Sequence, residues 1–309
     1  MVDAPDQGTI FPSAGGNSAS PRVQAVYWRC LVALFASARI SNPDQRLALF
    51  CNVRPPVVDG IDIAAVLERY GVELRLVPLT ARLPQGRLAS WGNVLYFFDI
   101  LTALEAEDDD LRFALVDSDV LVTAPLDPLW ALLDRAEFVG YVVETGEDEP
   151  INGMTRRSMA QAAEGLAGRP FAPLQHFGGE LFATTIGAWK RNRALFDTML
   201  QQASNGVGPA SGVLTEEHIF SIAFALLQSR QRRRVAASVA SAGGKTLRAG
   251  GFLSMAGPAG LSRQHADIGN AREGNAAVCR TQKVSCEMDP RRLAASRQQA
   301  AQKSLTSFN

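Results

Sequence analysis

The chain has few cysteines, no Cys-x-x-Cys pair and no long hydrophobic run. Its four cysteines are Cys30, Cys51, Cys279 and Cys286, and the first two lie in apolar runs, as small core residues of a protein in a reducing compartment do. Residues 30–38 form the longest apolar stretch near the N-terminus, well short of the roughly 20 residues of a membrane span. Residues 1–20 lack the basic and apolar regions of a signal peptide. These absences favour a cytoplasmic protein without a transmembrane segment.

The chain also lacks net charge, although its basic and acidic residues are unevenly distributed. Residues 229–309 hold 14 Lys/Arg and 4 Asp/Glu, whereas the first 228 residues hold 17 and 27. The same segment has no Trp or Tyr, and only 12 of its 81 residues are Val, Ile, Leu or Phe, fewer than the roughly 20% that a core requires. We therefore predict a basic, Ala/Gly/Ser/Arg-rich tail that is disordered or aberrant. Nucleic-acid binding is disfavoured, because the interleaved aromatic residues of a single-strand platform are absent.

Between the ends, segments typical of strands alternate with segments typical of helices. The predicted strands are residues 47–53, 72–79, 113–116, 138–143 and 181–184, and the predicted helices are 24–39, 61–70, 93–106, a helix from 129, 155–165, 186–203 and 215–228. This alternation predicts an α/β fold with a mainly parallel central sheet flanked by helices. Residues 1–20, rich in Gly, Ser and Pro, are predicted to be a flexible N-terminus.

Asp117 and Asp119 follow the apolar run Phe113–Val116 and are the most informative pair in the chain. Burying a bare carboxylate at the end of such a strand is unfavourable, and two like charges repel. A shared cation offsets both effects, and paired hard oxygen ligands suit Mg²⁺ or Mn²⁺, which recruit substrate phosphates to complete their coordination. The alternative is a solvated turn or an Asx cap before Pro125.

The order of motifs resembles a nucleotide-diphospho-sugar glycosyltransferase of the GT-A fold. An α/β half is followed by Asp117-Ser118-Asp119, then by Phe-Gly-Gly-Glu-Leu-Phe at 177–182, and then by a helix with Glu-Glu-His-Ile-Phe at 216–220. This plan is similar to that of the blood-group-type retaining transferases and their bacterial relatives. The resemblance covers about residues 22–228, so a GT-A-like domain is predicted over 21–228.

The resemblance implies a metal and a nucleotide at the first motif. Asp119 would bind Mn²⁺ or Mg²⁺ directly, and Asp117 would contact the metal or the ribose. The metal would bridge the donor diphosphate and stabilise the leaving group as a Lewis acid. Trp91, Asn93 and Asp99 lie on the segment that would sit beneath the nucleotide, for which uridine is the family expectation. Trp91 is alternatively a packing residue before a helix.

The second and third motifs would line the sugar site. Gly178 and Gly179 would let the backbone approach a ligand, or simply make a tight turn. Glu180 would hydrogen-bond hydroxyls of the donor sugar or the acceptor. Glu216 and Glu217 are candidates for the carboxylate of a retaining enzyme or the base of an inverting one, or they merely complement the helix dipole.

Three further residues near these motifs have candidate roles. Thr215 is a plausible N-cap. His218 is either a metal or phosphate contact or an ordinary partly buried histidine, and the same holds for His176.

The predicted function is metal-dependent transfer of a hexose-type sugar from a nucleotide-diphosphate donor to a hydroxyl acceptor. The chain departs from the family pattern at one place, which weakens this prediction. In the family, a C-terminal segment with aromatic residues and a histidine supplies a further metal contact, and the residues after about 228 lack it. His265 is not taken as that ligand. Two alternatives follow. One is a degenerate, non-catalytic nucleotide-sugar-binding protein, and the other is a sugar nucleotidyltransferase, disfavoured because Gly15-Gly16 has no following basic signature. A Rossmann dehydrogenase is disfavoured as well, since no Gly-x-Gly-x-x-Gly follows a strand.

Overall fold

The computed structural model describes residues 8–11, 15–84 and 92–229, together with the backbone of 235–239, 246–247 and 252–254. All of these belong to one unit, Met1–Ser241 with Lys245–Leu261; a second unit, Ala242–Gly244 with Ser262–Asn309, lies outside the described residues. Within the described part there are seven helices: α1 (Pro21–Ser41), α2 (Ile63–Arg69), α3 (Tyr96–Leu104), α4 (Asp127–Leu133), α5 (Arg156–Ala167), α6 (Ile186–Asn205) and α7 (Glu216–Ser229). These helices and the strands between them confirm the predicted α/β fold.

The N-terminal part of the chain forms a small parallel α/β layer. Strands β3 (Leu47–Cys51) and β6 (Val72–Leu76) pair in parallel, with α2 between them in sequence. Helix α1 begins after Ser20, whose side chain accepts a hydrogen bond from the Val23 amide. It ends at Ser41, and its C-cap Asn42 directly precedes Pro43. Side chains of α1, α2 and β3 share one hydrophobic core. The helices and the strand that the sequence patterns predict in this region are therefore the elements that pack together.

The central sheet is mixed, which corrects the prediction of a mainly parallel sheet. Its order is β13 (Phe252–Ser254), β11 (Val235–Val239), β9 (Phe138–Val143), β10 (His176–Thr185) and β7 (Arg112–Val116). Three of its four pairings are antiparallel, and only β11 and β9 run parallel. The first residue of β10 lies beside the last residue of β9 (His176 opposite Val143), so the chain enters β10 at the end where it left β9 and must run back.

Strand β10 is also longer than predicted, because it includes the two glycines. The apolar pattern predicts a strand only over residues 181–184, whereas β10 begins at His176. Its register against β9 shifts between Gly178 and Phe182, which is the irregularity of a β-bulge. The bulge places Gly179 and Glu180 beside the end of β7, where Leu181 pairs with Val116.

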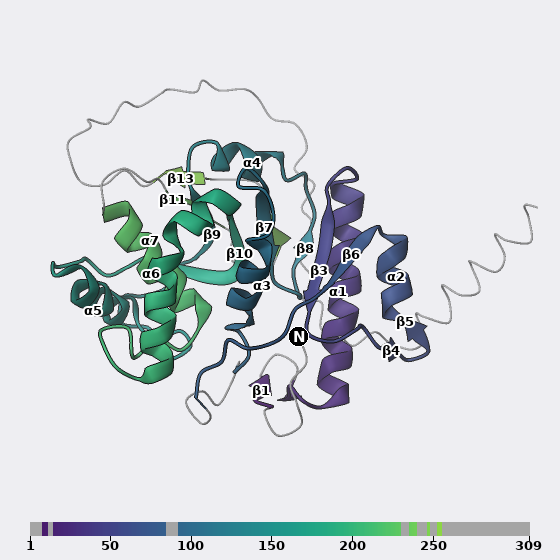
Figure 1. The fold of residues 1–309 in the computed structure, drawn as a ribbon, viewed down its shortest axis with the longest axis horizontal. Coiled ribbons are helices and arrows are strands. Elements are labelled where there is room, and N and C mark those ends of the chain that lie inside the picture. Colours follow the sequence, from purple (N-terminus) through teal and green to yellow (C-terminus); the bar gives the residue numbers. More distant parts are fainter. Residues whose placement is uncertain are drawn as a thin grey trace, which may run out of the picture. The chain divides into compact units, whose positions relative to one another are not determined.

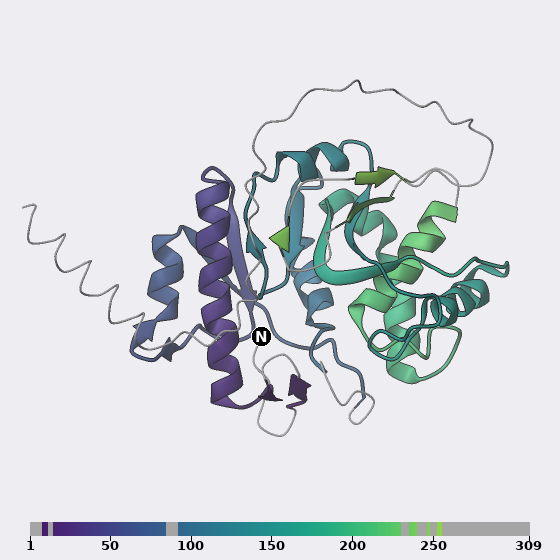
Figure 2. The same ribbon diagram turned by 180° about the vertical axis from the view of Figure 1, so that it is seen from behind.

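Helices lie on both sides of the pair of strands β7 and β10. Figures 1 and 2 show α1 and α2 beside β3 and β6, and α6 and α7 beside β10, with β7 between the two groups. A second core joins α3, α5, α6, α7 and the strands β7, β9 and β10. Its largest buried side chains are Trp189, Phe138, Phe182, Phe196, Phe220 and Phe224.

Several short strands had no counterpart in the sequence prediction. They are β1 (Ile10–Phe11), β2 (Gly16–Asn17), β4 (Val57–Val58), β5 (Ile61–Asp62), β8 (Leu121–Val122) and β12 (Thr246–Leu247). Strands β11, β12 and β13 fall in the segment for which a disordered or aberrant tail is predicted; β11 pairs with β9 and β12 with β8. The division of the chain at residues 20 and 228 stays a prediction.

Within the described residues, only α1 is long and apolar enough to span a membrane when judged by length and composition. A core helix of a soluble protein or an N-terminal signal sequence satisfies the same test. Part of α1 is covered by protein, since its buried residues are Val23, Trp28, Leu31, Leu34, Phe35 and Ala38. The cytoplasmic location stays a prediction.

Candidate active site

A cleft of about 670 Å³ is lined by residues of α1, β3, α3, β7, β10 and the start of α7. One part of its wall is apolar and includes Leu31, Leu34, Phe35, Leu49, Phe97 and Phe113. The loop after β7, strand β10 and the start of α7 add five carboxyl groups to the lining: Asp117, Asp119, Glu180, Glu216 and Glu217. Residues as far apart in the sequence as Leu31 and Glu217 thus line the same cleft.

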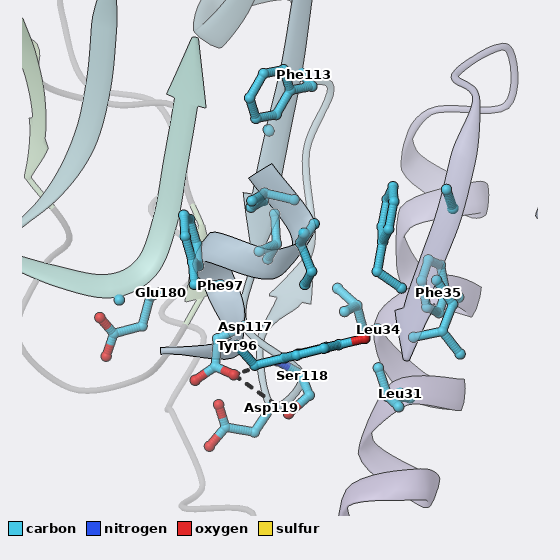
Figure 3. Close-up of a pocket in the computed structure, with 18 of the residues that line it drawn as sticks. Leu31, Leu34, Phe35, Tyr96, Phe97, Phe113, Asp117, Ser118, Asp119 and Glu180 are labelled. Atoms are coloured by element: carbon cyan, nitrogen blue, oxygen red, sulfur yellow. Dashed lines mark hydrogen bonds between the residues drawn. The ribbon is translucent and has the colours of Figure 1, made fainter. Parts of the chain in front are cut away.

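The register of β7 and β10 brings the first motif to Glu180. The Asp117 amide donates a hydrogen bond to the Glu180 carbonyl over 3.2 Å, which joins the loop after β7 to the bulge of β10. One carboxylate oxygen of Asp117 accepts a hydrogen bond from the Ser118 amide at 2.6 Å. Figure 3 shows the carboxyl groups of Asp117 and Asp119 on the same side of their loop, with Glu180 on the neighbouring strand and the apolar side chains of α1 across the cleft.

Glu217 is held by groups from two other segments, the loop at Asn152 and strand β10. Its carboxylate accepts hydrogen bonds from Asn152 Nδ2 at 2.8 Å and from the Gly179 amide at 3.1 Å, and it lies 3.4 Å from His176 Nε2. Burial opposes ionisation of Glu217, but the hydrogen bonds from His176, Gly179 and Asn152 outweigh it and lower the pKa of this carboxyl. Glu217 is therefore an ionised side chain, and each of its two carboxylate oxygens accepts a hydrogen bond.

Glu216, the neighbouring residue, has the opposite environment. Its Oε2 is buried and accepts no hydrogen bond. Burial, followed by the negative charges of Glu217, Asp117 and Glu180, raises the pKa of Glu216 well above its usual value. The sequence could not separate the two glutamates, and the structure does.

Gly178 and Gly179 are required where carboxyl groups approach the backbone of β10. A Cβ atom added to Gly179 would lie 2.5 Å from Glu216 Oε1, and one added to Gly178 would overlap Glu180 Oε2. An added side chain at either position would therefore displace a glutamate carboxyl group; the predicted approach of a ligand stays a prediction. Gly179 also lines the cleft.

His218 of the third motif and His176, which directly precedes the second motif, both contact other groups of this chain. His218 is fully buried, and its Nδ1 accepts hydrogen bonds from the amides of Leu214 and Thr215 while Nε2 lies 3.0 Å from the Ile151 carbonyl. Nε2 therefore carries the proton, and burial lowers the pKa of His218 to about 4. His176 is also buried and faces Glu217.

The three residues predicted to lie beneath a nucleotide have different positions. Asn93 is buried and lines the cleft. Asp99 is not among the lining residues; its carboxylate accepts hydrogen bonds from the amides of Thr80 and Ala81, at 2.7 and 2.9 Å, and from the Thr80 hydroxyl. Asp99 thereby holds the loop after β6 rather than facing the carboxyl groups. Trp91 lies outside the described residues.

The donor set suits a metal ion bound largely through its substrate. Across the described ranges, no three His, Cys, Asp or Glu side chains are grouped so as to hold a metal ion. Mg²⁺ and similar ions are nevertheless often bound by one or two protein carboxylates together with substrate phosphates and water. Asp117 and Asp119 supply such a pair, so the residues fit an ion that arrives with a diphosphate.

Two residues of the cleft were missed by the sequence analysis. Asn152, which binds Glu217, has a left-handed backbone with φ of 48°, and the Asn-Gly pair at 152–153 is a turn signal that could have indicated it. Thr215 lines the cleft with a hydroxyl that is not used as a cap, and no sequence signal distinguishes such a threonine from an N-cap.

No protein-family model matches the chain, and no curated protein matches it. Fold and cleft together describe an α/β protein with an acidic site at the end of β7.

Proposed function

We propose that this chain is a metal-dependent glycosyltransferase of the GT-A type. It would transfer a hexose-type sugar from a nucleotide-diphosphate donor, with a UDP-sugar as the first expectation, to a hydroxyl acceptor. The observation that carries the proposal is the meeting of the three motifs, Asp117–Asp119, Gly179–Glu180 and Glu216–Glu217, in one cleft.

Chemical roles follow from the environment of each carboxyl group. When bound, Mn²⁺ or Mg²⁺ would be held by Asp117 and Asp119 and would supply Lewis-acid stabilisation of the departing diphosphate. Glu217 holds the bulge of β10 through the Gly179 amide, which makes it a positioning residue. Glu180 and Glu216 are the carboxyl groups placed to contact sugar or acceptor hydroxyls, and burial together with the neighbouring negative charges raises the pKa of Glu216 and so favours its protonated form.

The test is calorimetric titration with UDP in the presence of Mn²⁺, in the presence of EDTA, and with Asp119→Ala. Metal-dependent binding that Asp119→Ala weakens at least about tenfold, or 1.4 kcal/mol, is the expected result. Asp134→Ala is the matched control, because Asp134 is an exposed aspartate whose partner is Arg112 and which does not line the cleft. A folded protein that binds neither UDP nor another nucleoside diphosphate would contradict the proposal.

A second candidate is a degenerate transferase that binds a nucleotide sugar without turnover. The sequence after residue 228 favours it, because that segment has no Trp or Tyr and lacks the aromatic, histidine-containing segment expected for the family. The two candidates differ in product formation. Mixing the protein with a set of UDP-hexoses, Mn²⁺ and a panel of hydroxyl acceptors, and measuring released UDP, separates them. A transferase passes the hexose to an acceptor hydroxyl and frees UDP, whereas a binding protein releases none above the rate without protein.

A further inference from the structure

The cleft runs between the edges of two strands, β3 and β7. Strand β7 lies at one end of the central sheet, and among the described strands β3 pairs only with β6. Consecutive residues of both strands line the cleft, 47–50 of β3 and 112–116 of β7. Because successive side chains of a strand point to opposite faces, a cavity that meets consecutive residues lies beside the edge of the strand. Such an edge presents backbone N–H and C=O groups that can pair with another strand.

Both strands lie between the same two layers of side chains. Phe50 of β3 and Phe113 of β7 pack in the core that contains α3, while Leu49 of β3 and Val116 of β7 pack in the core that contains α1. Side chains of both helices also line the cleft: Phe97 and Ile100 from α3, and Leu31, Leu34 and Phe35 from α1. Figure 3 shows Phe97 across the cleft from the side chains of α1. The space between β3 and β7 therefore has the four walls that surround a strand in a covered sheet: two strand edges and two helix faces.

The size of the cleft matches a short extended chain. A residue of a strand occupies roughly 160 Å³ of a covered sheet, given a rise of about 3.3 Å, a strand spacing of about 4.8 Å and about 10 Å between packed layers. The cleft of about 670 Å³ thus has room for about four residues in the extended conformation. This is close to the length of β3 and β7, which have five residues each.

Contacts before and after β7 fix the position of the layer formed by α1, β3 and β6. Before β7, Arg75 of β6 forms an ion pair with Glu107 at 2.6 Å. After β7, the Ser41 hydroxyl of α1 donates a hydrogen bond to the Val122 carbonyl at 2.9 Å, and the Val122 amide donates one to the Ser37 hydroxyl at 3.1 Å. These contacts oppose a movement of β3 onto the edge of β7, so the space between the two strands is a preformed feature of the fold.

An extended polypeptide is the occupant whose chemistry matches all four walls. Its main-chain groups can pair with both strand edges, and its side chains alternate between the α1 wall and the α3 wall. A hydrocarbon chain would fit the apolar walls but leave the backbone groups of both edges without partners, which is unfavourable. A glycan would place its hydroxyl groups against apolar side chains.

We infer that the cleft binds an extended, largely apolar polypeptide segment between β3 and β7, and that this segment carries the acceptor. The loop with Asp117 and Asp119 directly follows β7, so one end of the segment reaches the acidic site. The acceptor role rests on the proposed function, and it makes the acceptor a serine or threonine hydroxyl. In the transfer, the bond between sugar C1 and the diphosphate oxygen breaks and a bond between C1 and the hydroxyl oxygen forms. UDP leaves with the bonding electron pair, and the hydroxyl proton passes to the solvent.

The binding experiment needs no nucleotide. The probe is a pool of acetylated and amidated peptides that begin with Lys-Thr, end with Thr-Lys and vary over Ala, Val, Leu and Ile at the four positions between. The pool is incubated with the full chain, and captured peptides are identified by mass spectrometry. The best binder is then made with N-methyl groups on its four central residues. This change should weaken binding at least about tenfold, because the main-chain donors are lost while the side chains are kept.

Two variants of the protein fill the cleft. Ala48→Leu adds bulk from β3 and Ala38→Leu adds bulk from α1, and both alanines line the cleft. Each variant should weaken the affinity for the peptide at least about tenfold, because the added side chain takes the place of the bound segment. Melting temperatures show whether each variant is folded, and the second variant keeps the comparison possible when the first does not fold.

Ala33→Leu is the matched control. Ala33 is an exposed residue of α1 that does not line the cleft. The same substitution there should leave both the melting temperature and the affinity for the peptide, within about twofold, unchanged.

The captured peptide also tests the acceptor role. When it is incubated with the protein, Mn²⁺ and a mixture of UDP-glucose, UDP-galactose and UDP-N-acetylglucosamine, it should gain the mass of one sugar on a threonine. The analogue with valine in place of both threonines should bind with similar affinity and gain no sugar.

Three results would overturn the inference while metal-dependent UDP binding upholds the proposed function. They are a pool from which no peptide is captured, an N-methylated peptide that binds as tightly as its parent, and sugar transfer to oligosaccharides but to no bound peptide. Binding of dodecanol, as a hydrocarbon probe, by a protein that captures no peptide would overturn it as well. Peptide binding by a protein that does not bind UDP would uphold the peptide site but overturn the acceptor role together with the proposed function.

Discussion

Gly179 and Glu216 are coupled at the scale of single residues. The carboxyl group of Glu216 fits where it does only because position 179 lacks a side chain. The atom that a Cβ would meet is the end of a flexible side chain, so an added methyl group displaces Glu216 rather than the backbone. Elsewhere in the same sheet, a Cβ added to Gly140 would lie 2.7 Å from the buried ring of Phe177 and 3.1 Å from that of Phe224, and those rings cannot move away.

Gly179→Ala is therefore expected to affect function more than stability. If Glu216 has the proposed role, its displacement should lower turnover by up to about 100-fold, while the free energy of unfolding should change by less than about 1 kcal/mol. Gly140→Ala is the comparison: overpacking should lower the free energy of unfolding by about 1–3 kcal/mol. Urea unfolding and UDP-hexose turnover of both variants check this, and an equal loss of stability in the two variants would contradict it.

At the scale of elements, α7 is fixed to β10 by aromatic stacking. Phe182 of β10 stacks on Phe220 of α7 with ring centroids 4.8 Å apart and an interplanar angle of 27°, and Phe97 of α3 meets Phe220 edge-on at 4.9 Å. Because α7 is buried along most of its length, its first turn cannot shift independently. The position of Glu216 and Glu217 in the cleft is thus a consequence of core packing behind them.

Phe220→Ala should remove this support. Large-to-small changes at fully buried phenylalanines cost about 3–5 kcal/mol, and Phe220 is 1% exposed. We expect a loss of that size in the free energy of unfolding, measured by urea denaturation. Ile40→Ala, at a side chain that is 79% exposed, should change it by less than about 0.5 kcal/mol. A loss under about 1 kcal/mol for Phe220→Ala would show that α7 is not anchored there.

At the scale of the whole molecule, buried ionisable groups make folding depend on pH. His218 is neutral in the fold, with a pKa lowered to about 4, whereas in the unfolded chain it titrates near 6.5. Its contribution to stability is complete above pH 6.5 and is lost as the pH falls from about 6.5 to about 4. Glu217, whose pKa is lowered, acts in the same direction below about pH 4.3. Glu216 acts oppositely, since its raised pKa makes its ionisation unfavourable as the pH rises.

The difference between wild-type and His218→Gln stability isolates the histidine. At 1.36 kcal/mol for each pKa unit, the His218 term amounts to roughly 3 kcal/mol between pH 7 and pH 4. Urea unfolding at intervals across this range should show the wild-type protein losing its advantage over His218→Gln as the pH falls. Parallel curves would mean that His218 does not become charged on unfolding.

Local sequence patterns were sufficient to predict most of the elements and the residues of the acidic site. Periodicity, proline positions and β-branched runs indicated all seven described helices to within a few residues, because those patterns reflect local backbone preferences and one buried face. The Asp-x-Asp pair after β7 was found for a similar reason, because carboxyl groups beside apolar runs are unfavourable unless they are used. The two later acidic motifs were singled out by the resemblance to GT-A transferases.

The way in which these parts combine could be learned only from the folded chain. The antiparallel course of β10 depends on where the chain re-enters the sheet, and its bulge sets Glu180 beside Asp117. The separate roles of Glu216 and Glu217 depend on Asn152, His176 and Gly179, which no local pattern connects. Long-range packing assigns hydrogen-bond partners, and these partners distinguish Glu217, which is held by three groups, from Glu216, whose Oε2 accepts no hydrogen bond.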